Sequence, residues 1–503
     1  MMHIKKIGRR LVKKTLYCLA ILTCLALFIS ILTVSHSNKQ KSFITSFPEK
    51  TKENPEKQQY FLATAQNYIN PGEKLINFAV GGGSSLVLFI KKDGEAKIIA
   101  RKVWSSKTQT IEWGNQMDHS TVMAPPIQKG YLQIEYLQNL PESVKDFFPK
   151  ILSFSSETDE NGCFSEVICD ESYIEGIEVS TFIKKYQPSP QIVAALYTEI
   201  FRCLREVIHT HRKKQFNDLM LEVSYLKKVE DRLRTANRAI PKVMDFLLQG
   251  ETITINNQNY INIPTILNYF RHHPHRDNLE PPYLCLVSGD TNTQNIMISE
   301  TEPLFRAIQT GVTDFTYKEI GIKFIDPRAV GFNSKGSTTV DDPLYDSKPF
   351  HNSFGNYDMI YDKHFDLINS SISGHSYIEI IEMNNPYALS YNGLESHFKD
   401  IMKNGWGVNQ KFIQEDPHWL TRFIFLLGTH FAAMIPFQIE KIDVPTPIDD
   451  VEAQKRAVAI YCEGVKWLNL ALKILDGATS EFLGISVHQE LFNRVDNCEE
   501  VRS

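Results

Sequence analysis

The sequence predicts an α+β fold, in which a β-rich N-terminal lobe precedes a mainly helical C-terminal lobe, behind one transmembrane helix. Three observations lead to this prediction. Between Ile76 and Trp104, apolar and polar residues alternate on both sides of a glycine-rich turn, which is typical of consecutive antiparallel strands. From Gln191 to Asn237, and again near the C-terminus, apolar residues recur at helical spacing. An uncharged apolar run occupies residues 15–34.

The apolar run is the first predicted element, and it follows a basic segment, residues 1–14. A run of about 20 residues can cross a bilayer as a helix. A signal peptide is the alternative, although its apolar region usually has only about 7 to 15 residues. The basic segment favours a cytosolic N-terminus and a non-cytosolic body, and lysines beyond the run weaken this bias. Residues 35–57, rich in Ser, Lys, Glu and Pro, predict a stalk.

The predicted N-lobe covers residues 58–177. After the strands that end near Trp104, the apolar spacing from Gln133 to Leu140 predicts a helix, which Pro141 stops. Strand character returns in residues 147–152 and 164–176.

The predicted C-lobe covers residues 178–503. A helical region is followed by a hairpin at residues 253–263 and by two short apolar strands near Asn295 and Asp326. Residues 418–437 and 457–475 predict the clearest late helices. The apolar stretch of residues 423–437 is only about 15 residues long and contains a histidine, so we expect a core helix and not a second membrane span.

Composition narrows the function classes. Hydrophobic residues make up 42% of the chain and charged residues 22%, which predicts a packed core. The formal net charge of -5 and a pI near 6.3 argue against a nucleic-acid partner. The eight cysteines form no Cys-x-x-Cys pattern that would indicate zinc, and both disulfides and free thiols remain open.

Three polar residues beside the two short strands are candidates for chemistry. Asp290 and Asn295 belong to the segment SGDTNTQNIMI, and Asp326 ends the strand in IKFIDPR. If the strands pair, Asn295 and Asp326 can converge on one Mg²⁺ ion, since hard cations bind oxygen ligands. Asp290 would then lie nearby as a general base. Taken singly, each residue is equally typical of a turn or a cap.

Further upstream, a glycine turn, a strand lysine and a helix glutamate occur in that order. Backbone N–H groups of Gly81, Gly82, Gly83 and Ser84 could approach phosphate oxygens, although a plain hairpin turn is an equal alternative. Lys102 lies in mid-strand, where burial demands a partner, and Glu135 on the following helix is the candidate.

These motifs resemble those of the aminoglycoside phosphotransferase and choline kinase-like superfamily. GDTNTQNIMI is similar to its Gly-Asp-x4-Asn catalytic loop, and IKFIDPR is similar to its metal-binding segment. Within the superfamily, IDPRAVG, DDPLYDS and HFAAMIPF resemble segments of phosphotransferases associated with capsule and surface polysaccharides. The likeness runs from about Phe78 to Leu475.

The resemblance implies a two-lobed protein-kinase-like fold that uses ATP and Mg²⁺ to phosphorylate a hydroxyl. It implies that Lys102 holds the nucleotide phosphates and pairs with Glu135, that Asp290 is the catalytic base, and that Asn295 and Asp326 bind Mg²⁺. Asp342 and Asp346 match a later segment and are expected to brace the catalytic loop.

Several residues depart from the family pattern. Ser288 replaces a histidine or an arginine, and Pro327 replaces the phenylalanine of the protein-kinase triplet, which argues against a regulated protein kinase. Residues 299–321 form an insertion that we expect over or beside the cleft.

The leading interpretation is a membrane-anchored kinase that acts on a small molecule, a sugar or a glycan. A pseudokinase scaffold that binds a protein partner and an AMP transferase on the same fold are the alternatives. Five residues after the metal segment could line an acceptor site or could equally be surface residues: Asp341, Asp342, Tyr345, His351 and Tyr357.

Overall fold

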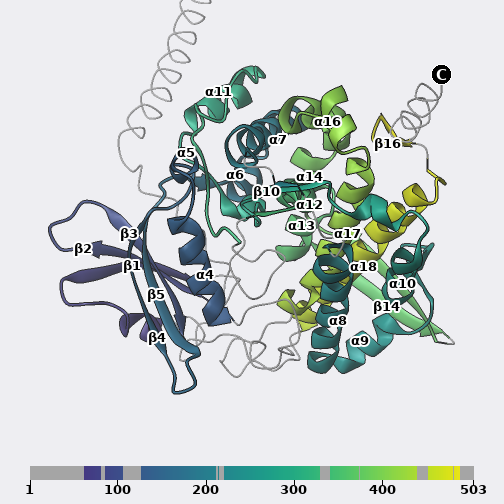
Figure 1. The fold of residues 1–503 in the computed structure, drawn as a ribbon, viewed down its shortest axis with the longest axis horizontal. Coiled ribbons are helices and arrows are strands. Elements are labelled where there is room, and N and C mark those ends of the chain that lie inside the picture. Colours follow the sequence, from purple (N-terminus) through teal and green to yellow (C-terminus); the bar gives the residue numbers. More distant parts are fainter. Residues whose placement is uncertain are drawn as a thin grey trace, which may run out of the picture. The chain divides into compact units, whose positions relative to one another are not determined.

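A five-stranded antiparallel sheet forms the first part of the protein (Figure 1). The computed structural model describes residues 62–80, 85–105, 126–210, 213–214, 220–328, 340–372, 374–438, 451–479 and 481–487. The sheet order is β1-β2-β3-β5-β4. Its strands are β1 (Glu73–Val80), β2 (Leu86–Lys92), β3 (Ile98–Ser105), β4 (Ile151–Thr158) and β5 (Phe164–Ser172). The predicted consecutive strands are therefore confirmed.

Helix α4 (Pro126–Gln138) covers one face of this sheet. Trp104 on β3 and Val167 on β5 pack there with Ile134 of α4. Because side chains alternate along a strand, Lys102 points to the α4 face together with Trp104, and Arg101 points to the opposite face. The helix predicted from Gln133 exists, but it begins earlier and ends at Gln138.

The second part of the protein is mainly helical and is larger (Figure 1). Its longer helices are α6 (Val179–Tyr186), α7 (Pro190–Cys203), α8 (Lys227–Ala239), α9 (Pro241–Leu248), α10 (Ile263–His272), α11 (Glu302–Thr310), α17 (Trp419–Gln438) and α18 (Val451–Leu475). Its shorter α-helices are α12 (Lys348–Ser353), α13 (Tyr357–Tyr361), α14 (Ala388–Tyr391), α15 (Phe398–Ile401) and α16 (Gln410–Glu415), whereas α5 (Glu142–Lys145) comes earlier in the chain, between α4 and β4. The described chain is therefore α+β, with a sheet-rich part and a helical part, as predicted.

Short strands and turns connect these helices. The strands are β6 (Ile177–Glu178), β7 (Lys213–Lys214), β8 (Thr252–Ile255), β9 (Gln258–Ile261), β10 (Tyr283–Leu286), β11 (Ile296–Ile298), β12 (Ile322–Phe324), β13 (Val340–Asp341), β16 (Glu481–Phe482) and β17 (Ile485–Ser486). The 3-10 turns are η4 (Arg276–Leu279), η5 (Thr293–Asn295), η6 (Pro343–Asp346) and η7 (Leu394–His397), and the π-helical turns are η2 (Leu204–Ile208), η3 (Met220–Leu226) and η8 (Met402–Trp406). Strand β10 leads into η5 and β11, the segment that carries Asp290 and Asn295.

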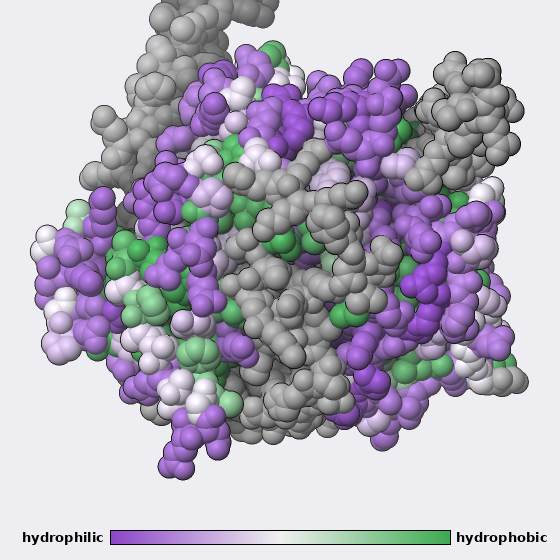
Figure 2. Space-filling model, viewed as in Figure 1, coloured by the Kyte–Doolittle hydropathy of each residue, from purple (hydrophilic) through white to green (hydrophobic). Residues whose placement is uncertain are grey.

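Helix α17 lies in the core of the helical part. Among the described residues, Trp419–Gln438 is the helix long and apolar enough to cross a membrane, and 89% of its apolar window is buried within the protein. It packs along α18, which is also largely buried. The prediction of a core helix is therefore confirmed. Figure 2 shows a mostly hydrophilic surface on the face in view, where hydrophobic residues gather only in small groups.

One region differs from the prediction. The last third of the chain was expected to be mainly helical, but β14 (Phe365–Ile372) and β15 (His375–Glu382) form an antiparallel hairpin. Strand β15 also pairs with β8, which extends the predicted β8–β9 hairpin into a four-stranded sheet. In β15, Ser376 and Ile378 are buried while Tyr377 and Glu379 are exposed, which is the alternation of a strand with one packed face.

Candidate active site

The β11–β12 hairpin brings Asn295 and Asp326 to the same end of two paired strands. Ile296 pairs with Phe324, and the N–H of Ile325 donates to the carbonyl oxygen of Asn295 at 2.9 Å. Antiparallel pairing joins these ends whatever the length of chain between the strands. The expected approach of the two candidate metal ligands is thus built into the backbone.

The insertion between these strands packs against α6 and α7. Helix α11 buries Leu304 and Ala307, and the Phe305 ring lies 4.9 Å from that of Tyr186 on α6. Beyond α11, the N–H of Tyr317 donates to a carboxylate oxygen of Glu199 on α7 at 2.8 Å. The insertion is therefore an integrated part of the helical core. The contacts described here for the insertion are with α6 and α7, and its expected place over or beside the cleft stays a prediction.

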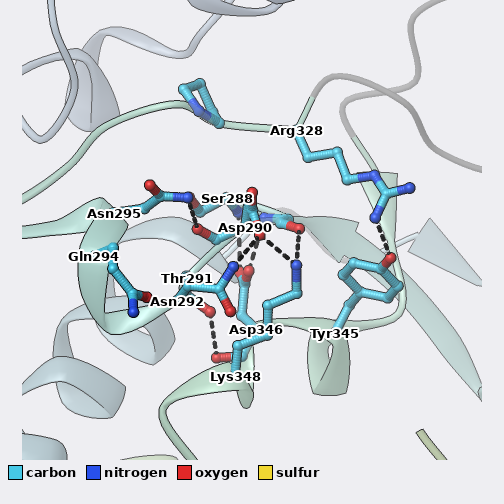
Figure 3. A network of polar contacts seen from close by, with 12 residues as sticks. Ser288, Asp290, Thr291, Asn292, Gln294, Asn295, Arg328, Tyr345, Asp346 and Lys348 are labelled. Carbon is cyan, nitrogen blue, oxygen red and sulfur yellow. Dashed lines mark hydrogen bonds and ion pairs between the residues drawn. The ribbon is translucent and has the colours of Figure 1, made fainter. Parts of the chain in front are cut away.

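Asp290 has one carboxylate oxygen held and one that can accept a proton. The amide of Asn292 donates to Oδ1 at 2.8 Å, and the ammonium of Lys348 reaches the same atom at 2.5 Å. Among the residues that the structure describes, no hydrogen bond to Oδ2 is formed. Asp290 is also partly accessible, since 32% of its side chain is exposed. Its geometry suits a proton acceptor (Figure 3).

Asp346 braces the loop that carries Asp290. Its two carboxylate oxygens accept the backbone N–H groups of Ser288 at 2.9 Å and of Gly289 at 2.7 Å. His209 contacts the same carboxylate at 2.9 Å. Ser288 thus helps to orient the loop through its backbone N–H. This contact does not need the histidine or arginine that the family resemblance led us to expect at position 288. The bracing role expected of Asp346 is matched by these contacts.

A glycine is required at position 289 for two reasons. Its φ of +76° lies in the left-handed region that side chains disfavour. A Cβ atom there would also lie 3.0 Å from the Cβ of Arg328. The N–H of Arg328 donates to the carbonyl oxygen of Ser288 at 2.8 Å, so the Asp326 segment runs directly beside the Asp290 loop.

Two further buried carboxylates lie near this region, and one of them, Asp358, supports the same loop. Asp358 accepts hydrogen bonds from Gln294 at 2.9 Å and from Tyr391 at 2.6 Å, and burial raises its pKa to about 6. Asp342 is paired with Arg422 at 2.5 Å, inside the helical core. Within the described residues, the hydrogen bonds of the Asp342 carboxylate join it to Tyr225, Leu344 and Arg422 and not to the Asp290 loop, so the direct bracing expected of Asp342 is not seen. The contribution of Asp358 was not predicted from the sequence.

Lys102 connects the sheet-rich part to the Asp326 segment. Its ammonium contacts the carboxylate of Asp326 and lies 3.1 Å from that of Glu171 on β5. The α4 side chain that reaches it is Gln133, at 3.4 Å. Burial alone would lower the pKa of Lys102, but the neighbouring charges of Asp326 and Glu171 raise it above the usual lysine value.

The expected pair of Lys102 with Glu135 is therefore replaced by Lys102 with Glu171. On helix α4, Gln133 faces Lys102, and residues two apart on a helix point in different directions. Strand pairing supplies the carboxylate instead. Lys102 lies opposite Cys169, and Glu171 follows two residues later on the same face of β5.

The groups around Asp326 fit a divalent cation that also binds phosphate. The amide nitrogen of Asn295 donates to the carbonyl oxygen of Asp290 at 3.0 Å, which leaves the amide oxygen of Asn295 for a cation. Asp326 adopts a φ of +52°, a conformation rare for residues with side chains and frequent at functional sites. Burial, together with the charge of Asp326, raises the pKa of Glu171 and of Glu178. At Glu171 the charge of Lys102 opposes this effect.

Protein side chains supply only part of a coordination shell. Within the described ranges, no group of three or more His, Cys, Asp or Glu side chains could hold a metal ion. Mg²⁺ is commonly bound through one or two protein oxygens, substrate phosphates and water. Asn295 and Asp326 match that mode. The remaining predicted phosphate contacts, Gly81, Gly82, Gly83 and Ser84, lie outside the described residues, as do residues 1–14, 15–34 and 35–57.

Three cationic residues beside Asp290 or the neighbouring Tyr345 were not predicted as site residues. Lys348 follows Asp346 by two residues, and Arg328 follows Asp326 by two. Lys228 comes from the distant helix α8. Lys348 and Arg328 could have been predicted as site residues, because each lies two positions after a candidate aspartate. Nothing in the sequence around Lys228 indicated that it belongs to the site.

Comparisons with known proteins add little. No family model and no curated protein matches the chain. A solved structure titled "Crystal structure of BubR1 kinase domain" is similar with a TM-score of 0.22 and 8% sequence identity, over 84% of this chain and 100% of that chain. A TM-score this low carries no argument about fold or function. Any functional conclusion therefore rests on the geometry of the site.

Proposed function

We propose that this protein is a membrane-anchored, ATP-dependent phosphotransferase with a kinase-like two-lobed fold. Its acceptor is a hydroxyl of a small molecule, a sugar or a glycan. The observation that carries the proposal is the meeting of Asp290, Asn295 and Asp326 at one end of the β11–β12 hairpin, with Lys102 reaching Asp326 from the sheet. Residues 15–34 supply the anchor, with the body on a non-cytosolic side that contains ATP.

In this proposal, nucleotide and acceptor meet between Lys102 and Asp290. Lys102 holds the α- and β-phosphates of ATP, and the turn at Gly81, Gly82, Gly83 and Ser84 covers the phosphates. Asn295 and Asp326 hold Mg²⁺, which when bound neutralises charge on the phosphates. Lys102 leaves its direct contact with Asp326 when the phosphates arrive, because both groups then gain a partner of opposite charge.

Asp290 receives the proton of the acceptor. The hydroxyl oxygen forms a bond to the γ-phosphorus, the bond between that phosphorus and the bridging oxygen of ADP breaks, and the hydroxyl proton moves to Oδ2 of Asp290. Lys348 and Asn292 hold Oδ1, and so they fix the direction of Oδ2. Positioning and electrostatics supply most of the rate enhancement in such reactions.

The proposal is tested by separating nucleotide binding from turnover. We expect MgATP to raise the melting temperature of the purified full-length protein, and ATP without Mg²⁺ to do so less. Asp326→Asn should abolish the Mg²⁺-dependent shift, whereas Asp290→Asn should keep it and lose phosphorylation of any acceptor found in a screen. A product heavier by one phosphate identifies a kinase, and one heavier by AMP identifies the alternative transferase.

One observation favours a second candidate, the pseudokinase scaffold. The direct ion pair of Lys102 with Asp326 occupies the two groups that nucleotide binding requires. In a scaffold this pair would be permanent and would join the two parts of the protein. A well-folded protein whose melting temperature is unchanged by MgATP would support the scaffold and refute the kinase.

A further inference from the structure

A buried tyrosine next to the Asp290 loop is surrounded by cationic side chains from three elements. Tyr345 belongs to η6, and its hydroxyl oxygen accepts a hydrogen bond from Lys228 of α8 at 2.8 Å and another from Arg328. Lys348 of α12 lies 5.1 Å from the centre of the same ring. Figure 3 shows Arg328, Tyr345 and Lys348 close to Asp290.

Two of these cations lack a carboxylate partner. Lys348 is paired with Asp290, but no ion pair between a carboxylate and Lys228 or Arg328 exists within the described part of the chain. Asp341 acts on both cations only through space. Both side chains are only partly exposed, so their positive charges lose some hydration without gaining an ion pair, and this loss is unfavourable.

The pKa of Lys228 also responds to the surrounding positive charge. Burial, together with the charge of nearby Arg328, lowers the pKa of Lys228 to about 8, against the opposing effect of Tyr345. His430, whose ring centre is 4.2 Å from that of Tyr345, has its pKa lowered by burial and by Lys348 and Lys228. An anion bound beside Lys228 and Arg328 would be favoured by the charges of both side chains, and would raise the pKa of Lys228.

Arg328 and Tyr345 lie on the side of Asp290 that is opposite to Asn295. In Figure 3, Asn295, a proposed Mg²⁺ ligand, lies on one side of Asp290, and Arg328 with Tyr345 lies on the other. Lys348 joins the two regions, since it contacts Asp290 and also lies against the Tyr345 ring. A group bound at Arg328 and Tyr345 would therefore sit beside Asp290, on the side opposite Asn295.

We propose that Lys228, Arg328 and Tyr345 form a subsite for an acidic group on the acceptor, a phosphate or a carboxylate. This proposal rests on the proposed function, because it names the substrate class of that same site. The guanidinium of Arg328 offers paired donors that match the oxygens of a carboxylate or phosphate, and Lys228 adds a point charge. The acceptor is then an acidic compound, such as a sugar phosphate or a uronic acid, and not a neutral sugar.

The test measures anion binding while the nucleotide site is filled. Purified full-length protein is saturated with Mg²⁺ and a non-hydrolysable ATP analogue, and is then titrated with inorganic phosphate, glucose 6-phosphate, glucuronate or glucose. We expect the acidic probes to bind and glucose not to bind. Comparing glucose 6-phosphate with glucuronate shows whether phosphate or carboxylate is preferred.

Matched variants locate the binding. Lys228→Met and Arg328→Met should each raise the dissociation constant for the best acidic probe at least about tenfold. Lys227→Met removes the same charge from the adjacent position of α8 and should leave that constant unchanged. Melting curves in the absence of probe show whether each variant is folded, and Tyr345→Phe, which removes the shared oxygen but keeps the ring, provides a second variant of the cluster.

The outcomes of the two proposals differ. Wild-type protein that responds to MgATP but binds no acidic probe would overturn the subsite and leave the kinase standing. Equal losses in Lys227→Met and Lys228→Met would also overturn it. Loss of the MgATP response in Lys228→Met or Arg328→Met would mean that the cluster serves the nucleotide and not the acceptor. Failure of the wild-type MgATP response is the separate failure of the proposed function.

Discussion

At the scale of single residues, the site is organised by buried charges that hold backbone as well as side chains. Asp346 illustrates this, because each of its oxygens accepts one backbone N–H of the Asp290 loop. Hydrogen bonds to a charged group contribute more than neutral ones. Removing such an acceptor also leaves buried N–H groups without a partner, which adds to the loss.

We therefore expect Asp346→Ala to lower the free energy of unfolding by about 3 kcal/mol. Urea denaturation followed by circular dichroism measures it. Asp277→Ala serves as the control, since the Asp277 side chain is 92% exposed, and it should change stability by less than about 0.5 kcal/mol. Equal effects of the two substitutions would show that Asp346 does not brace the loop.

The protonation of Tyr345 yields a spectroscopic prediction. Burial raises the pKa of its phenol, but the charges of Arg328, Lys228 and Lys348 outweigh burial and lower it to about 8. An ordinary tyrosine ionises near pH 10. Because the folded-state pKa is depressed, the stabilisation from the phenolate is complete above about pH 10 and is lost as the pH falls through about 8.

Ultraviolet titration should therefore show one tyrosinate forming near pH 8, before the bulk of the tyrosines. Tyr345→Phe should remove this early step. Tyr377→Phe, at an exposed position of β15, should keep it. An early step that survives in Tyr345→Phe would refute the assignment.

At the scale of secondary-structure elements, the spacing of apolar residues along the sequence predicted individual strands but not which side chains meet across the sheet. Strands β1, β2 and β3 follow from the alternation between Ile76 and Trp104, and the approach of Asn295 to Asp326 follows from two short apolar strands flanking them. The partner of Lys102 could not be predicted in this way. It depends on the register of β3 against β5, which the sequence does not specify locally and which selects Glu171 in place of Glu135.

The packing of residues 299–321 is a second feature that could not be predicted from the sequence. The spacing between Asn295 and Asp326 showed that extra residues lie there, but not which helices they contact. Leu304 of α11 is fully buried in the helical core, whereas Ile308 on the same helix is 36% exposed. Leu304→Ala should lower the free energy of unfolding by about 2 to 5 kcal/mol, as is usual for a buried leucine. Ile308→Ala, the matched surface change, should cost about 1 kcal/mol or less. Urea denaturation distinguishes the two, and similar small costs would mean that α11 is not part of the core.

At the scale of the whole molecule, the candidate site is assembled from segments far apart in the chain. Lys102 comes from the sheet, Lys228 from α8, Arg328 from the segment that follows β12, and Lys348 from α12. The sequence motifs identified the two segments that contain Asp290 and Asp326. It could not identify Lys228, because only the packing of α8 beside η6 brings that residue to Tyr345.

The chain passes from the sheet-rich part to the helical part at Gly176, between β5 and β6. This glycine has a φ of +147°, and a Cβ atom there would overlap the carbonyl oxygen of Ile298. Strand β6 pairs with β11 directly after it, through Ile177 and Ile298. A side chain at position 176 would therefore push β6 away from β11, the strand that begins next to Asn295.

We expect Gly176→Ala to lower the free energy of unfolding by more than about 2 kcal/mol, since neither backbone can yield to the contact. MgATP binding should weaken as well, because displacing β11 moves Asn295 relative to Asp326. Gly162→Ala isolates the cost of backbone strain: Gly162 has a φ of +77°, but a Cβ atom there would meet nothing within 4 Å, so only about 1 to 2 kcal/mol is expected. If Gly176→Ala cost no more than Gly162→Ala and left MgATP binding intact, the connection between the two parts would tolerate movement of β6, and the position of Asn295 would not depend on it.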